Sequence, residues 1–322
     1  MFPPRGSLTV CFAHVAYRLQ ERFLARETGI ASFEVRSAEE LARRIGEADV
    51  LAVSGLWRST LLEPAHRLKF IQSVSAGVDQ FDRSLLAAQG IKLASAQGVN
   101  ERAVAEHAMA LILALARRLP EARDNQARRH WRGMARSLEG REDELGGKTL
   151  LIVGLGRIGA RLARLAKAFD LRVLGIRRDP AAGVNGADAA FAPDRLGELL
   201  PAADFVALTC PLTPETRGMI DGGALGRMKP TAYLVNVARG RCVEEAALVE
   251  ALAQGRLAGA ALDCFAEEPL PSSSPLWAFE NVLITPHTAG ETKRYEEKVL
   301  DILLENLERL WAGAERLVNQ IV

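Results

Sequence analysis

The chain has 322 residues and a formal charge of +1, from 41 basic and 40 acidic side chains. That length is too great for one compact core and suits two domains, and the composition is that of ordinary globular proteins. A near-neutral charge with scattered basic residues argues against nucleic acid or an acidic membrane as a partner. We find neither a membrane span nor a signal peptide, so we expect a soluble, cytoplasmic protein.

The four cysteines indicate neither a disulfide framework nor a zinc site. They lack CxxC spacing and do not cluster with histidines. Three lie inside apolar runs, where a buried small hydrophobe is the expected role. We predict no metal site and a reducing environment. The cysteines are Cys11, Cys210, Cys242 and Cys264.

Short apolar runs alternate with helical patterns in the first part of the chain, which predicts α/β domains with mainly parallel sheets. Residues 101–119 form an apolar helix that we expect to be buried. Residues 120–147 are polar around a lone Trp131, a pattern typical of either a disordered linker or an arm that packs on a partner. The candidate strands before this segment are 8–12, 50–53 and 70–74.

The pattern is sharper after Lys148. A buried strand at 149–153 runs into Gly154-Leu155-Gly156-Arg157-Ile158-Gly159 and then into a helix, and the tail at 291–311 is again helical. The apolar stripe of the helix after the glycines consists of Ile158, Leu162, Leu165, Ala166 and Phe169. Further strands are predicted at 171–176, 205–208, 233–236, 259–262 and 282–284.

The glycine run has the GxGxxG spacing of a dinucleotide-binding turn, in the required context of a strand before it and a helix after it. Gly154 permits the tight turn, Gly156 lets the backbone approach a pyrophosphate, and Gly159 lets the helix pack close to the strand. The helix start adds free N–H groups and a positive dipole end. A purely structural turn is the alternative. We expect a bound dinucleotide, with Arg157 and Ile158 contributing to its site.

The end of the second strand predicts which nicotinamide cofactor is preferred. An acidic residue there accepts hydrogen bonds from the ribose of NAD. This chain has Arg177 and Arg178 instead, and guanidinium groups bind a 2′-phosphate in a forked geometry. We therefore expect NADP(H) to be preferred, with NAD(H) as the alternative if both arginines are solvated and Asp179 takes the ribose.

Several ordered segments resemble those of the D-isomer-specific 2-hydroxyacid dehydrogenases, and among these the glyoxylate and hydroxypyruvate reductases in particular. The resemblance runs from about Leu68 to Gly290. The chain departs from the usual pattern at 243–245 and at Cys264, away from the expected proton chemistry. The segments are 75–79 (SAGVD), 104–107 (VAEH), 154–159 (GLGRIG), 211–216 (PLTPET), 236–240 (NVARG), 263–269 (DCFAEEP) and 285–290 (TPHTAG).

The resemblance implies a catalytic trio. Arg239 would hold the substrate carboxylate and polarise the 2-oxo group, because a guanidinium is always charged and matches a planar carboxylate. His287 would be the general acid/base, and Glu268 would pair with it and favour the imidazolium. Singly, each residue also fits an ordinary surface arginine, a strand-end histidine or an exposed turn.

Other site residues follow from the same resemblance. The amides of Ala76 and Gly77 would bind the substrate carboxylate, and Asp263 would orient the nicotinamide amide. Trp57 would border the substrate side chain, although an aromatic residue at a strand end is usually packing. His107 is expected to be a packed core or interface residue rather than a second base. The remaining residues expected at the cofactor are Cys210, Pro211, Thr216, Val237 and Ala238.

The implied architecture is α/β, with two doubly wound parallel-sheet domains. A Rossmann cofactor domain at 100–287 is inserted into a flavodoxin-like substrate domain at 1–99 and 288–322. Residues 120–147 resemble a dimerisation arm, so we expect a homodimer. Trp131 would either reach the neighbouring subunit's substrate pocket or serve as an interface anchor.

These features together predict an NAD(P)H-dependent oxidoreductase that interconverts a small 2-oxo acid, of the glyoxylate or hydroxypyruvate type, and its D-2-hydroxy acid. Phosphite-type oxidation would keep the same trio and is one alternative. A dinucleotide-sensing, corepressor-like binding protein on the same fold is another. A formate dehydrogenase would carry glutamine where this chain has Glu268. The sequence leaves the particular 2-oxo acid open, because the pocket is assembled from distant loops.

Overall fold

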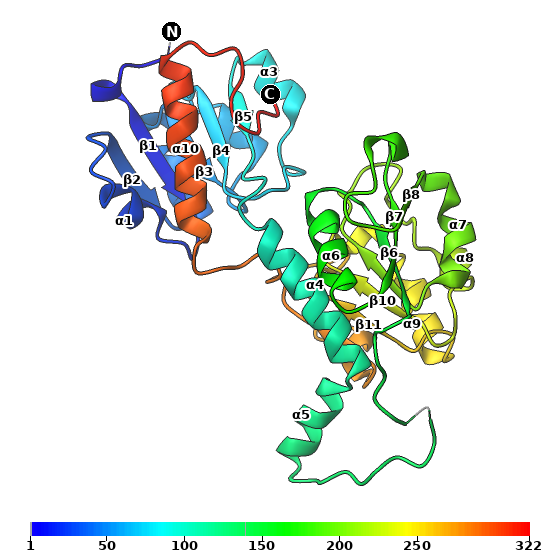
Figure 1. Ribbon diagram of the computed structural model, residues 1–322. Helices are drawn as coiled ribbons and strands as arrows, with labels where there is room; N and C mark the ends of the chain where they lie inside the picture. The colour runs from blue at the N-terminus through cyan, green and yellow to red at the C-terminus, as the bar shows by residue number, and fades with distance from the viewer. Residues whose placement is uncertain (1, 139) are drawn as a thin grey trace. The chain divides into compact units, whose positions relative to one another are not determined.

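The computed structural model (Figure 1) divides into two compact units, Met1–Asn100 with Thr292–Val322 and Glu101–Glu291. It describes residues 2–138 and 140–322. Met1 and Glu139, which fall in the predicted substrate domain and the predicted arm, lie outside the described residues. Within the described ranges, no helix is long and apolar enough to cross a membrane.

The described residues of the first unit form a five-stranded sheet in the order β2-β1-β3-β4-β5, with every neighbouring pair parallel. This 2-1-3-4-5 order is that of flavodoxin-like sheets. Alternate residues of the central strands belong to separate cores on the two faces, as the two-residue period of a strand requires. Helix α10 covers one face (Figure 1).

The elements of the first unit have the following bounds: β1 Thr9–Ala13, α1 Leu19–Leu24, β2 Ala31–Val35, α2 Ala38–Arg44, β3 Val50–Val53, β4 Phe70–Ser73, α3 Arg83–Ala88, β5 Lys92–Ala94 and α10 Tyr295–Trp311.

The described residues of the second unit form a seven-stranded parallel sheet in the order β12-β11-β10-β9-β6-β7-β8. Counted from β6, this is the 3-2-1-4-5-6 order of a Rossmann fold with one added strand. The order reverses between β6 and β9, which makes their carboxyl ends the topological switch point where ligands bind in such sheets. Helices α4 and α6 pack together on one face (Figure 1), and α8 and α9 pack in the core of the other.

The elements of the second unit have the following bounds: α4 Glu101–Ala116, α5 Leu119–Ala127, β6 Thr149–Val153, α6 Arg157–Lys167, β7 Arg172–Ile176, β8 Ala189–Phe191, α7 Leu196–Leu199, β9 Phe205–Leu208, α8 Gly222–Leu225, β10 Tyr233–Asn236, α9 Glu245–Ala253, β11 Gly259–Leu262 and β12 Val282–Ile284.

The α/β class with two parallel sheets is therefore confirmed, but some elements differ from the sequence prediction. Strands β2, β5 and β8 were not predicted, and all three lie at sheet edges. These three edge strands are less enclosed and lack the apolar runs that reveal central strands, whereas the edge strand β12 keeps such a run and was predicted. The predicted helix 101–119 ends at Ala116, since Arg118 adopts a left-handed φ of 50°, and a second helix then occupies the start of the predicted arm. Phe169 was wrongly placed on a buried stripe: it lies beyond the end of α6 and is 41% exposed.

The chain passes between the units after Asn100 and again after Glu291. The sequence predicts these crossings near Asn100 and after His287. Residues just beyond His287 stay with the seven-stranded unit because the Asp263 carboxylate accepts hydrogen bonds from the amides of Thr288, at 2.9 Å, and Ala289, at 3.0 Å.

Candidate active site and cofactor site

The glycine turn lies at the switch point, between the carboxyl ends of β6 and β9. Gly154 has a φ of 108°, and a Cβ atom there would lie 2.5 Å from the backbone nitrogen of Cys210. A Cβ atom on Gly159 would lie 2.4 Å from the carbonyl oxygen of Gly154. Neither position can therefore take a side chain without rearrangement.

Gly156 differs from these two glycines, because none of the described atoms lies within 4 Å of the position that its Cβ would take. It is the N-cap residue of helix α6, and no described side chain caps that helix start. Open space beside free N–H groups and the positive end of a helix dipole suits an anionic pyrophosphate. The residues present thus fit the phosphates of a dinucleotide.

The two arginines after β7 differ in how they are held. Arg177 donates through Nη1 to the carbonyl oxygens of Gly183, at 2.8 Å, and Ala182, at 3.4 Å, and so stabilises its own loop. Arg178 is exposed. The pKa of Glu215 is lowered chiefly by a hydrogen bond from Thr213, and the charge of Arg178 contributes to the same shift. Asp179 caps the following turn by accepting a hydrogen bond from the amide of Ala181 at 3.0 Å.

The other residues expected at the cofactor lie around the same strand ends. Arg157 pairs with Glu101 at 3.2 Å, and Ile158 packs against the core under α4. The Thr216 hydroxyl donates to the Pro211 carbonyl at 2.7 Å and shapes the loop after β9. Three further residues expected at the cofactor are buried: Cys210, Val237 and Ala238.

Arg239 follows β10 on a turn that is fixed by a buried amide. Asn236 is 1% exposed; its side chain accepts from the Ala238 amide at 3.0 Å and donates to the Arg239 carbonyl at 3.1 Å. A Cβ atom on Gly240 would lie 1.9 Å from the carbonyl carbon of Phe265, so the turn is pressed against the segment after β11. Only glycine allows this approach.

His287 and Glu268 form a hydrogen-bonded ion pair. Nδ1 of His287 lies 2.7 Å from Oε2 of Glu268, whose Oε1 accepts the Phe265 amide at 2.9 Å. The hydrogen bond to Glu268 raises the pKa of His287 above its ordinary value, against partial burial and the charge of Arg239. Partial burial raises the pKa of Glu268, but the bonds from His287 and Phe265, together with the charges of His287 and Arg239, lower that pKa overall.

Arg239 belongs to the same cluster, because the turn that carries it is pressed against Phe265, whose amide binds Glu268. The charge of Arg239 lowers the pKa of both Glu268 and His287. It also donates through Nη1 to the Ala238 carbonyl at 2.8 Å. The structure therefore brings together a guanidinium, a carboxylate and an imidazole from segments that follow three adjacent strands. Such a set can bind an anion and move a proton at one place.

Asp263, expected at the nicotinamide amide, is 2% exposed and organises the turn that carries His287. Its carboxylate accepts the Thr285 hydroxyl at 2.6 Å as well as the two amides that follow His287. His107 contacts this group through Thr285 at 3.1 Å.

The residues predicted to touch substrate from the first unit lie in two settings. Ala76 and Gly77 are partly exposed in the loop after β4. Trp57 is 1% exposed, and its ring packs against Phe81 with centroids 5.3 Å apart. This burial favours the packing interpretation of Trp57 over a place beside the substrate.

Sequence reasoning missed the residues that hold these turns. Asn236 is the last residue of one predicted strand, and Thr285 directly follows another. Glu245 accepts the Ala266 amide at 3.1 Å. A polar residue at the end of an apolar strand was the available signal, since a buried polar group needs hydrogen-bond partners.

The seven-stranded unit, with its glycine turn at the switch point, defines a dinucleotide-binding domain of the Rossmann class. The family profile for the D-isomer specific 2-hydroxyacid dehydrogenase, NAD binding domain, matches residues 109–289. The chain belongs to this family and is one of its oxidoreductases.

Known proteins similar to this chain support that assignment. It is 36% identical over 293 residues to a glyoxylate reductase of Korarchaeum cryptofilum, covering 89% of this chain and 87% of the relative. It is 38% identical to a D-3-phosphoglycerate dehydrogenase of Methanocaldococcus jannaschii, with 87% of this chain but only 53% of that longer relative covered. An NADPH-dependent glyoxylate/hydroxypyruvate reductase of Sinorhizobium meliloti, solved with NADP and malonate, superposes with a TM-score of 0.83 at 28% identity and covers 98% of this chain and 97% of its own.

Replacing Glu268 by glutamine is expected to lower the pKa of His287, because the hydrogen bond that His287 donates to this carboxylate is the main cause that raises it. With its pKa raised in the fold, His287 contributes stability that is fully present below its unfolded pKa and lost as the pH rises through its folded pKa. E268Q should remove this pH dependence. The chain has five histidines, so NMR titration of their imidazole signals, assigned with H287N, measures the pKa directly.

The matched control is E267Q, which removes the same charge one position earlier and should leave the His287 titration nearly unchanged. An E268Q protein whose His287 titrates as in the wild type would refute the electrostatic account of the pair.

Proposed function

We propose that this protein reduces a small 2-oxo acid of the glyoxylate or hydroxypyruvate type to a D-2-hydroxy acid with NAD(P)H. The observation that carries the proposal is the cluster of Arg239, Glu268 and His287, with His287 and Glu268 only 2.7 Å apart. Relatives named glyoxylate reductase support the substrate class.

In the proposed mechanism, Arg239 binds the substrate carboxylate and polarises the neighbouring oxo group. The glycine turn at 154–159 would hold the dinucleotide, whose reduced nicotinamide would supply the hydride for the oxo carbon. Nδ1 of His287 is engaged by Glu268, which leaves Nε2 as the atom that gives its proton to the developing alkoxide. The amides of Ala76 and Gly77 are proposed to bind the carboxylate as well. The first unit would then serve as the substrate domain and the second as the cofactor domain.

The test is an absorbance assay of NADPH consumption with glyoxylate or hydroxypyruvate, comparing the wild type with H287N. A correctly placed general acid is worth roughly 10²–10⁴-fold, so H287N should lose about that much of kcat. Binding of NADPH, followed by protein fluorescence, should remain. The control is H66N, a histidine of the first unit, which should keep full activity.

Chiral analysis of the glycerate formed from hydroxypyruvate must give the D isomer, because glycolate, the product from glyoxylate, is achiral. A wild-type protein that binds the dinucleotide but turns over none of the 2-oxo acids would instead support the sensing, corepressor-like alternative. Turnover of phosphite with NADP would support the other alternative.

We further propose that NADP(H) is preferred, and that Arg178 rather than Arg177 binds the 2′-phosphate. Arg177 already donates to two carbonyl groups of its own loop, whereas Arg178 is exposed at the carboxyl end of β7. Asp179, the residue that would favour NAD, accepts a hydrogen bond from a neighbouring amide.

Replacing Arg178 by glutamine should lower kcat/KM for NADPH roughly ten- to a hundredfold, the value of one charge-assisted hydrogen bond of about 1.5–3 kcal/mol. The value for NADH should hardly change. R172Q, at the opposite end of β7, is the control and should leave both unchanged. A wild-type preference for NADH, or an R178Q protein with unaltered preference, contradicts the assignment.

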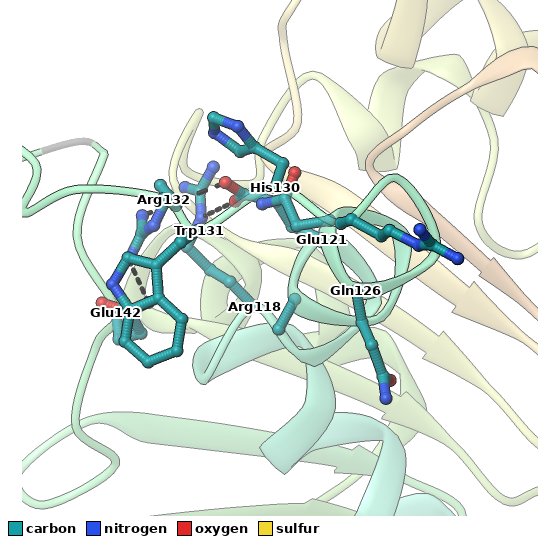
Figure 2. Close-up of a pocket in the computed structure, with 10 residues that line it drawn as sticks. Arg118, Glu121, Gln126, His130, Trp131, Arg132 and Glu142 are labelled. Atoms are coloured by element: carbon teal, nitrogen blue, oxygen red, sulfur yellow. Dashed lines mark hydrogen bonds and ion pairs between the residues drawn. The ribbon is translucent and has the colours of Figure 1, made fainter.

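We also propose a homodimer formed through the arm at 120–147. The arm exposes large apolar side chains, with Trp131 at 94%, Met134 at 98% and Leu138 at 74%, which is unusual for a surface that faces only water. Figure 2 shows Trp131 together with the ion pair of Arg132 and Glu142. These three side chains belong to the lining of a cavity of about 560 Å³.

Replacing Trp131 by glutamate should raise the dimer dissociation constant roughly 30-fold or more, if this side chain is an interface anchor worth about 2 kcal/mol. Sedimentation velocity measures the change. The control is W277E, an exposed tryptophan outside the arm, and should leave assembly unaltered. A monomeric wild type would rule out the dimer.

A further inference from the structure

His107 lies on α4, within two turns of the point where the chain enters the second unit, and its side chain is 24% exposed. Its Nε2 atom is 3.1 Å from the Thr285 hydroxyl and 3.7 Å from Oδ1 of Asp263. Thr285 follows β12, an edge strand of the seven-stranded sheet, so this contact joins α4 to that edge. The partly buried imidazole of His107 needs hydrogen-bond partners, and Thr285, beside the turn that carries His287, is one of them.

The hydrogen-bond directions in this group follow from the number of protons available. The carboxylate of Asp263 can only accept, so the Thr285 hydroxyl uses its one proton on Oδ1 at 2.6 Å. The hydroxyl oxygen is then an acceptor toward His107. His107 must therefore carry a proton on Nε2 and donate it to Thr285.

The same carboxylate determines the shape of the turn that carries His287. It binds the hydroxyl of Thr285 before His287 and the amides of Thr288 and Ala289 after it. His287 itself has a φ of 56°, the left-handed region that a residue with a Cβ atom adopts only when surrounding contacts hold it. Its amide closes the turn onto the Thr285 carbonyl at 3.0 Å.

We propose that His107 is a positioning residue for His287. Its Nε2–H fixes the Thr285 hydroxyl on Asp263, and this hydroxyl anchors the first half of the turn from which the imidazole projects. His107 acts through Thr285 and Asp263 and takes no proton from the substrate. The inference rests on the proposed function for the role of His287, but the hydrogen-bonded group can be tested without any substrate.

The kinetic test compares H107L, which has no donor, with H107Q, whose side-chain amide places an N–H near the position of Nε2. H107L should lower kcat roughly 10- to 100-fold, because a misplaced acid loses alignment with the oxo group, while binding of NADPH is retained. H107Q should recover most of the activity. The control is E106Q, an exposed neighbour on the same turn of α4, which should behave like the wild type.

The second readout is hydrogen exchange of the peptide 283–291, which contains the two amides held by Asp263. H107L should exchange faster than the wild type in this peptide, and H107Q should not. Equal exchange in H107L and the wild type, or an H107Q protein as impaired as H107L, overturns the proposal. If the wild type reduces no 2-oxo acid, the proposed function fails, and the exchange comparison still decides the role of His107.

Discussion

The turn that carries His287 depends on one buried carboxylate. Asp263 is 2% exposed, and a buried charge is stable only when hydrogen bonds replace its lost hydration. Three donors from 285–289 meet this requirement and thereby fix the backbone on both sides of His287. The register of the sheet makes this possible. Leu262 on β11 pairs with Ile284 on β12, so the residues that follow these strands, Asp263 and Thr285, lie side by side. The proposed acid/base residue therefore owes its position to electrostatics at the end of a neighbouring strand.

Parallel pairing extends the same logic to the rest of the cluster. Strands β10, β11 and β12 are neighbours, and the segments that follow them supply Arg239, Glu268 and His287 in chain order. Because all three strands run in one direction, segments far apart in the sequence end at a single edge. The glycine turn after β6 ends at that edge too. The contact between Gly240 and the Phe265 backbone then brings the first two segments together more closely than strand spacing alone would.

Much of this arrangement follows from local sequence patterns, and the limits of prediction have physical causes. Central strands enclosed on both faces need continuous apolar runs, so they were predicted, whereas the edge strands β2, β5 and β8 were not. The GxGxxG spacing identified the cofactor turn, and two of its glycines, Gly154 and Gly159, cannot take a side chain without rearrangement. Contacts between residues distant in sequence left no local pattern: His107 and Thr285 are 178 positions apart. The sequence likewise suggested two equivalent arginines after β7, because nothing in it reveals that Arg177 bonds the carbonyl groups of its own loop.

The trio also requires a balance of charges that its individual members would not reveal. A guanidinium beside an imidazole disfavours the imidazolium, and partial burial acts in the same direction. The charge of Arg239 by itself would lower the pKa of the neighbouring imidazole and so disfavour the proton that the proposed acid has to give. Glu268 reverses this effect, because its hydrogen bond with Nδ1, the largest contribution, acts together with its charge to raise the pKa of His287. The carboxylate remains charged for the same reason, since the bonds from His287 and Phe265 lower its own pKa. In this chain, Glu268 on the far side of the imidazole therefore offsets the effect of Arg239 and favours the protonated form of His287.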